Sequence, residues 1–299
     1  MKIRMSMHSL VFWYLCLVHV SCCFCFTNFA FGDSIVDAGN NNYLPSLSKA
    51  DYSPYGIDFT PSGGKPTGRY TNGFTIVGRI PLRMQIKNFE RSRAEMVKTM
   101  GENSTRNFLK DAIFSLTIGS NDIITYFLPN LPFRLHELGA RKMVIVDVGP
   151  LGCIPFVRAI HLLPEGECHE EMNTLIRGYN EKLRVAVHRL NQEIGMDSIF
   201  VYANSYDVIN GILQNYGDYG FENVNDPCCG GYFPPFFCFR IGDEKEISSS
   251  LCEDRSKYLF WDSYHPGQAA NFIIAQQMLN GDESICSPIN VRQLHSHKL

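Results

Sequence analysis

The sequence predicts an α/β protein in which one parallel sheet is covered by helices on both faces. Apolar runs of strand length occur at residues 29–31, 112–118, 142–148 and 198–202. Segments in which apolar residues recur at helical spacing alternate with these runs. Alternation of strands and helices favours parallel strands, because each crossover helix returns the chain to the same edge and covers a face of the sheet.

Composition favours one sizeable folded domain. Hydrophobic residues make up 45% of the 299 residues and charged residues 19%, which is typical of a globular protein. We place a single domain at residues 26–290 and a C-terminal tail at residues 291–299. The net charge of −3, with acidic and basic residues interspersed, gives no reason to expect nucleic acid as a partner.

The N-terminus has the pattern of a secretory signal peptide. Lys2 and Arg4 form a basic start, residues 10–20 an apolar core, and residues 21–23 a small-residue exit. We therefore expect a signal peptide at residues 1–25 and a secreted protein. An uncleaved anchor is the alternative, because apolar residues continue towards Phe31, but the run to residue 20 is too short to span a bilayer.

The first strand leads into a serine that is a candidate nucleophile. Residues 29–42 read FAFGDSIVDAGNNN, so that an apolar run is broken by Gly-Asp and followed by Ser34 at a turn. The carboxyl end of such a strand is where open α/β sheets bind ligands. Unpaired N–H groups at the following helical turn favour the oxyanion that serine attack produces. The alternative is an ordinary turn with a capping serine.

The segments that follow are assigned in chain order. Residues 40–73, rich in Gly, Pro, Ser, Thr and Asn, are expected to form a loop near the active site. Helices are expected from residue 86 to 100, from 172 to 194 and from 266 to 279. Asn121 follows the second strand, so in a parallel sheet it reaches the same edge as Ser34. Asparagine is also common in turns, and that is its alternative assignment.

An aspartate and a histidine near the C-terminus complete a candidate triad. Residues 261–267 read WDSYHPG, and the spacing allows Asp262 to fold back onto the ring of His265. A serine hydroxyl needs a base such as histidine, and a carboxylate then fixes the imidazole tautomer. Pro266 suits the first position of a helix, which places His265 at the helix start. Alternatively, Asp262 caps a turn and His265 lies on the surface.

The cysteines predict disulfides. Four of the 11 lie in or near the signal peptide, and seven remain. Cys153 is expected to pair with Cys168, while two more bridges are expected among Cys228, Cys229, Cys238 and Cys252. Cys286 would be left free. A zinc site formed by Cys153, His161, Cys168 and His169 is an alternative that an oxidising compartment disfavours.

One polar segment carries a modification signal. Asn103-Ser104-Thr105 is the only N-glycosylation triplet in the sequence. Because the segment is polar, we expect Asn103 to be accessible and glycosylated in a secreted protein.

Four blocks of the sequence together resemble the GDSL esterase/lipase family of plants, a branch of the SGNH hydrolases. The blocks are FGDSIVDAGNNN at 31–42, IGSND at 118–122, GARKMVIVDVGPLGCIP at 139–155 and YLFWDSYHP at 258–266. From residue 139 to about residue 287 the similarity is nearly unbroken. The resemblance implies a flavodoxin-like three-layer α/β/α fold and a serine esterase or lipase that needs no cofactor and no metal.

The resemblance also implies residue roles and a location. Ser34 would be the nucleophile, His265 the general base and Asp262 its partner, while the N–H of Ser34 and the side chain of Asn121 would hold the oxyanion. The substrate would be a lipid ester or an acylated carbohydrate. The protein would be secreted to the cell wall or apoplast, with no stable membrane span.

The sequence departs from the family pattern in two places. The family has a block between the GRYTNG-like turn at 68–73 and the helix from residue 86, and we find no counterpart here. That block contributes an edge strand and a glycine whose N–H is an oxyanion donor. A second gap follows Pro129, where the family has a longer helix. We therefore expect a sheet that lacks one edge strand, and a catalytically impaired binding protein or a truncated isoform is the alternative function.

Overall fold

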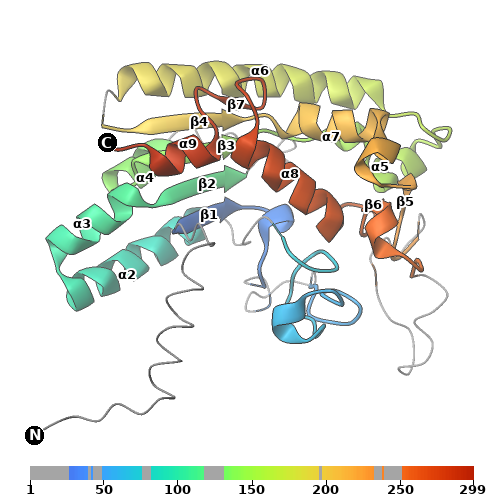
Figure 1. Ribbon diagram of the computed structural model, residues 1–299, viewed down its shortest axis with the longest axis horizontal. Coiled ribbons are helices and arrows are strands. Elements are labelled where there is room, and N and C mark those ends of the chain that lie inside the picture. The colour runs from blue at the N-terminus through green and yellow to red at the C-terminus, as the bar shows by residue number, and fades with distance from the viewer. Residues whose placement is uncertain are drawn as a thin grey trace, which may run out of the picture.

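The computed structural model describes residues 27–39, 42, 49–75, 82–117, 131–194, 197–231, 238 and 251–299. The predicted signal peptide at 1–25 and Asn121 lie outside these residues. Five strands form the central sheet in the order β1-β2-β3-β4-β7 (Figure 1). They are β1 (Asn28–Gly32), β2 (Ile113–Thr117), β3 (Lys142–Val146), β4 (Ile199–Ala203) and β7 (Cys286–Ser287). The first four strands are parallel and β7 is antiparallel, which confirms the four predicted strands.

Helices cover both faces of the sheet, which confirms the three-layer α/β/α architecture. Along β3, Val144 and Val146 face one layer while Met143 and Ile145 face the other, as the two-residue period of a strand requires. The first layer contains α7 (Ser205–Gln214), α8 (Gln268–Asn280) and α9 (Val291–Ser296). The second contains α2 (Leu82–Met100), α3 (Glu102–Asp111), α4 (Leu131–Glu137) and α6 (Glu170–Glu193).

In the described part of the chain, β1 is an edge strand, as expected if the family's outer strand is missing. It pairs only with β2 there. The side-chain amide of Gln85, on α2, accepts a hydrogen bond from Gly32 N (3.0 Å) and donates one to Gly32 O (2.8 Å). Phe89, one turn further along α2, packs edge-on against Phe29 at 5.1 Å. Helix α2 therefore satisfies the backbone where a neighbouring strand would otherwise pair.

The closing helix begins later than predicted. Its first residue is Gln268 and its N-cap is Gly267, whereas the sequence placed the start at Pro266. Pro266 instead forms a bridge with Phe260, and Gly267 N donates to Leu259 O at 2.8 Å. His265 consequently lies in a bent segment before the helix, closed by a hydrogen bond from Trp261 N to His265 O at 2.8 Å, and not at the first turn of α8.

The C-terminal residues are partly packed against the domain. Residues 291–296, which the sequence predicts as part of a tail, form α9, and Leu294 of this helix is fully buried in the core.

A smaller sheet and short helices surround the main sheet. The additional elements are β5 (Asn223–Pro227), β6 (Tyr258–Phe260), α5 (Pro155–Ile160), η1 (Ser34–Val36), η3 (Thr60–Ser62), η4 (Leu151–Cys153), η5 (Tyr216–Tyr219) and η7 (Arg255–Lys257). Strands β5 and β6 are parallel and lie beside α5 (Figure 1). Strand β6 leads directly into the segment that carries Asp262 and His265.

The disulfide predictions are confirmed. The bridges are Cys153–Cys168, Cys228–Cys252 and Cys229–Cys238. Cys286 is a buried free thiol, and burial raises its pKa to about 12, so it is poorly reactive. Because both sulfurs of the alternative zinc site are joined in a disulfide, they are not available as thiolate ligands. Among the described helices, none is long and apolar enough to cross a membrane.

Candidate active site

Ser34 opens a short helical turn at the carboxyl end of β1. The Asp33 side chain caps this turn by accepting from Ile35 N at 3.2 Å. Gly32 is required just before it, since an added Cβ would lie 2.3 Å from the carbonyl oxygen of Thr117. Within the described residues, neither the hydroxyl nor the backbone N–H of Ser34 makes a hydrogen bond. Both groups are thus available to a ligand.

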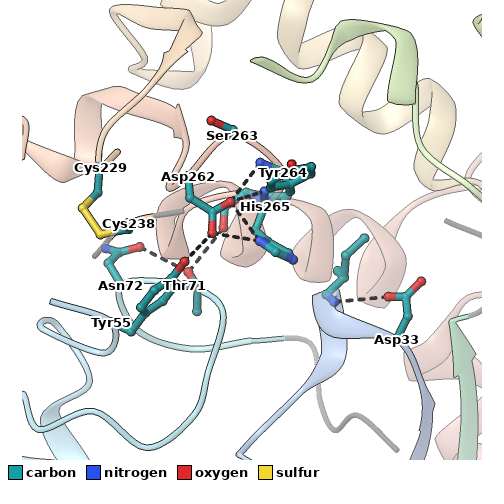
Figure 2. A network of polar contacts seen from close by, with 12 residues as sticks. Asp33, Tyr55, Thr71, Asn72, Cys229, Cys238, Asp262, Ser263, Tyr264 and His265 are labelled. Carbon is teal, nitrogen blue, oxygen red and sulfur yellow. Dashed lines mark hydrogen bonds and ion pairs between the residues drawn. A yellow bond between two sulfur atoms is a disulfide. The ribbon is translucent and has the colours of Figure 1, made fainter. Parts of the chain in front are cut away.

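Asp262 folds back onto His265, as the spacing predicted. The Nδ1 atom of His265 lies 2.8 Å from Oδ1 and 2.9 Å from Oδ2 of Asp262, and both side chains are buried (Figure 2). Oδ1 also accepts from the backbone N–H groups of Tyr264 and His265, at 2.9 and 2.8 Å. Because a carboxylate only accepts hydrogen bonds, Nδ1 carries the proton and Nε2 is left as the acceptor. This is the tautomer that a general base requires.

The loop that contains residues 49–75 packs against this pair. Tyr55 donates its hydroxyl to Asp262 Oδ2 at 2.9 Å (Figure 2). The ring of Tyr70 lies 5.1 Å from that of His265. The sequence predicts that this loop lies near the active site, and the described part of the loop contacts Asp262 and His265 of the candidate triad. No sequence pattern predicted a role for Tyr55 itself, which is 207 residues from Asp262 in the chain.

The GRYTNG-like turn fastens the loop to the start of α8. Asn72 accepts from Gln268 N at 2.8 Å and donates to Asp58 at 2.7 Å. Arg255 donates two hydrogen bonds to the same Asp58 carboxylate, at 2.6 and 2.7 Å. Burial alone would raise the pKa of Asp58, but the bonds from Arg255 and Asn72 outweigh burial and lower it. The turn, to which the sequence assigned no chemistry, thus holds the histidine segment in place.

The serine turn and the histidine segment border the same pocket. Ile35, Tyr264 and Pro266 all line it, so the neighbours of Ser34 and His265 in the chain face one space. The pocket encloses about 780 Å³, counting space open to solvent. Its other lining residues lie at and after the ends of β2 and β3, in η4, at the N-cap of α5 and on α7, α8 and β6: Thr117, Val146, Asp147, Gly149, Pro150, Leu151, Ile154, Ser205, Ile209, Leu259, Phe260, Asn271, Ile274 and Met278. Most of these side chains are apolar.

Two predicted site residues are not part of this arrangement. Asn121 lies outside the described residues, although β2, the strand that precedes it, pairs in register with β1 through Thr117 and Gly32. Asn103 is exposed on α3, far in sequence from the candidate triad. Its glycosylation stays a prediction.

Comparison with known proteins identifies the family. A model of the GDSL-like lipase/acylhydrolase family matches residues 29–278. The chain is 45% identical to GDSL esterase/lipase At5g41890 of Arabidopsis thaliana, covering 90% of this chain and 93% of the relative. It is 38% identical to GDSL esterase/lipase At4g16230 of the same plant, covering 91% of each. The first alignment spans 345 positions, more than the 299 residues here, so the relative has segments that this chain lacks. The chain belongs to the GDSL-like lipase/acylhydrolase family.

Proposed function

We propose that the protein hydrolyses carboxylic esters through a triad of Ser34, His265 and Asp262. Membership of its family makes the chain a carboxylic ester hydrolase. The observation that carries the residue assignment is the buried Asp262–His265 hydrogen bond, which leaves Nε2 as a free acceptor beside the pocket that the Ser34 turn borders.

The reaction begins with attack of Ser34 Oγ on the ester carbonyl carbon. His265 Nε2 takes the hydroxyl proton, and Asp262 stabilises the resulting imidazolium. The backbone N–H of Ser34, together with Asn121, donates to the oxyanion of the tetrahedral intermediate. His265 then protonates the departing alcohol, which leaves an acyl group on Ser34. A water molecule, deprotonated by His265, attacks this acyl-enzyme and releases the carboxylic acid.

The shape of the site supports an ester with a hydrocarbon acyl group. The pocket begins at Ile35 and continues between α7 and α8, where Ile209, Ile274 and Met278 line it. Burial of each CH₂ group in such surroundings contributes about 0.8 kcal/mol. An acyl chain gains this energy, whereas an acetylated sugar would leave the pocket unfilled. Among the ester classes that the sequence allows, we therefore propose lipid esters.

Several features support secretion. Three disulfides are typical of a protein that folds in an oxidising compartment. Residues 1–25 have the pattern of a signal peptide, and Asn103 is exposed for glycosylation. We propose a protein exported to the cell wall or apoplast, where the disulfides would persist.

A catalytically impaired binding protein is the second candidate. The observation in its favour is that a 45% identical relative has segments that this chain lacks, while β1 is an edge strand in the described part of the chain. The family resemblance implies that the missing block would contribute an oxyanion donor and a strand outside β1. Loss of one oxyanion donor typically reduces kcat by about 100- to 1,000-fold, so the triad would retain some reactivity.

Covalent labelling separates the two candidates. The folded, secreted protein is treated with a fluorophosphonate probe and its intact mass is measured, with Ser34→Ala as the test variant and the loop variant Ser62→Ala as the matched control. We expect one adduct on the wild type and on Ser62→Ala, and none on Ser34→Ala. A folded wild-type protein that takes up no adduct would overturn the esterase proposal in favour of the binding protein.

A further inference from the structure

We propose that Tyr55 is a positioning residue of the triad, which holds the Asp262 carboxylate against His265 through its hydroxyl. The inference rests on the proposed function and extends it to a residue outside the blocks that carry the triad. Its basis is a buried hydrogen bond between two segments that are 207 residues apart in the chain.

The two oxygens of Asp262 are held very differently. Oδ1 accepts from two backbone N–H groups of its own segment and from the imidazole. Oδ2 faces the same imidazole nitrogen at 2.9 Å, and its other donor among the described residues is Tyr55, also at 2.9 Å (Figure 2). Removal of the Tyr55 hydroxyl would leave Oδ2 with the imidazole alone. The orientation of the carboxylate plane therefore depends on Tyr55.

Tyr55 is itself fixed tightly enough to act in this way. Its side chain is 0% exposed, and its ring meets Tyr52, Tyr70 and Trp261 edge-on, at 5.4, 6.0 and 6.0 Å. Its backbone N–H donates to Tyr52 O at 3.1 Å. Rings packed in this way leave the hydroxyl little freedom, so the hydrogen bond is preorganised before substrate arrives.

The charge state of the cluster suits a donor role. Burial, and then the charge of Asp262, raise the pKa of Tyr55 well above its usual value, so the hydroxyl stays protonated. The same two causes raise the pKa of Tyr52 and of Tyr264 to about 12. Within the described residues, the titratable groups that face Asp262 are thus these three tyrosines and His265, and Tyr70 packs against the His265 ring. A hydroxyl donor spreads the carboxylate charge, and that charge sets how strongly the imidazolium is stabilised.

The chain offers a matched control elsewhere. Tyr202 donates its hydroxyl to the buried carboxylate of Asp147 at 2.7 Å, in a cluster that contains no histidine contact. Tyr55→Phe and Tyr202→Phe each delete one buried tyrosine–aspartate hydrogen bond and keep the ring. A purely structural role predicts the same consequences for both variants.

The first measurement is the rate of fluorophosphonate labelling of Ser34 between pH 5 and pH 9. In Tyr55→Phe the carboxylate charge is less spread, so the imidazolium is favoured and the midpoint of the acid limb moves up by about 0.5 to 1 pH unit. Tyr202→Phe should keep the wild-type midpoint. An unchanged midpoint in Tyr55→Phe overturns the proposal. So does loss of cooperative thermal unfolding in Tyr55→Phe alone, because that would make the role structural.

A second measurement does not depend on labelling. The proton between His265 Nδ1 and Asp262 gives a downfield ¹H NMR signal, which is identified by its loss in His265→Gln. We expect it further downfield in Tyr55→Phe and unmoved in Tyr202→Phe, and an unmoved signal in Tyr55→Phe overturns the proposal. A wild type that fails to label while this signal responds to Tyr55→Phe would refute the esterase function and leave the Tyr55 assignment standing.

Discussion

Two of the buried aspartates in the described part of the chain have similar surroundings but different partners. Asp147 follows β3 and is 4% exposed, while Asp262 follows β6 and is 0% exposed. Each accepts a hydroxyl hydrogen bond from a buried tyrosine, Tyr202 in one case and Tyr55 in the other. Burial and a tyrosine donor therefore do not distinguish Asp262, the carboxylate of the proposed triad, from Asp147.

The difference lies in the remaining partners. Asp147 Oδ1 accepts from the hydroxyl and the N–H of Ser205 and from the N–H of Tyr206, at 2.7, 2.6 and 3.1 Å. All these donors belong to the first turn of α7, so Asp147 anchors a helix to the sheet. The Oδ1 atom of Asp262 instead accepts a hydrogen bond from the imidazole Nδ1 of His265. A partner that can gain and lose a proton turns the same arrangement into a base.

The largest expected effect comes from Asp262→Asn. The amide would favour the wrong imidazole tautomer, so the labelling rate of Ser34 and the ester-hydrolysis rate should each fall by about 1,000- to 10,000-fold. Asp147→Asn should instead act mainly on thermal stability. Asp282→Asn, at an exposed aspartate near the C-terminus, is the control and should keep the wild-type rate. A rate for Asp262→Asn within ten-fold of the wild type would remove Asp262 from the triad.

The sequence anticipated one of these aspartates and not the other. Asp262 and His265 are three residues apart, so a single turn brings them together and the pair can be inferred from spacing. Asp147 stands inside an apolar run, KMVIVDV, and that run alone predicted only a strand. The aspartate within this apolar run could have indicated a buried carboxylate, and a buried carboxylate requires hydrogen-bond donors.

The parts that the sequence could not supply depend on tertiary packing. The Tyr55–Asp262 contact has no local pattern, because the loop reaches Asp262 only after the chain has folded. The start of α8 was placed two residues early, since Pro266 fits a first helical turn but pairs with Phe260 instead. The periodicity of apolar residues thus predicted the strands and helices of the three layers, and motif spacing predicted the triad candidates. The contacts around those candidates depend on hydrogen bonds between residues far apart in the chain.

The next largest effect is expected from the disulfides. Disulfide-bonded cysteines donate hydrogen bonds to the backbone just before Asp262, whereas the hydrogen bonds given above for Asp147 involve no cysteine. Cys228 N donates to Phe260 O at 3.0 Å, and Cys229 N donates to Trp261 O at 2.8 Å. Replacing Cys228 and Cys252 together by serine should reduce the free energy of unfolding by about 2 to 5 kcal/mol, as measured by denaturant titration, and slow the labelling of Ser34. Cys286→Ser is the control without a bridge. Unaltered labelling in the double variant would show that Asp262 is held without this bridge.

Asp147 should make the stability of the fold depend on pH. Burial raises the pKa of Asp147 to about 6, despite its hydrogen bonds, so the folded state favours the protonated form. Stability from this group is complete below about pH 4 and is lost as pH rises to about 6, a change of about 3 kcal/mol. Urea unfolding of the wild type and of Asp147→Asn from pH 4 to pH 7 measures it. The difference between the two proteins should vary across that window, and a constant difference contradicts the assignment.

The smallest effect tests how the two aspartates are held. Ser205 Oγ donates both to Asp147 Oδ1 (2.7 Å) and to its backbone oxygen (2.9 Å), so Ser205→Ala should cost about 1 kcal/mol of unfolding free energy. Because the lost donor stabilised the carboxylate, the pKa of Asp147 should rise and its pH window should move up. Among the described residues no serine holds Asp262 in this way: its Oδ1 accepts from the His265 imidazole and from two backbone N–H groups that side-chain substitution does not remove. Single side-chain substitutions should therefore remove the hydrogen bonds to Asp147 one at a time. Apart from His265, the side-chain donor whose removal should affect Asp262 is Tyr55. If Ser205→Ala leaves both the stability and the pH window unchanged, the helix N–H groups alone hold Asp147, and the two sites are more alike than their donors indicate.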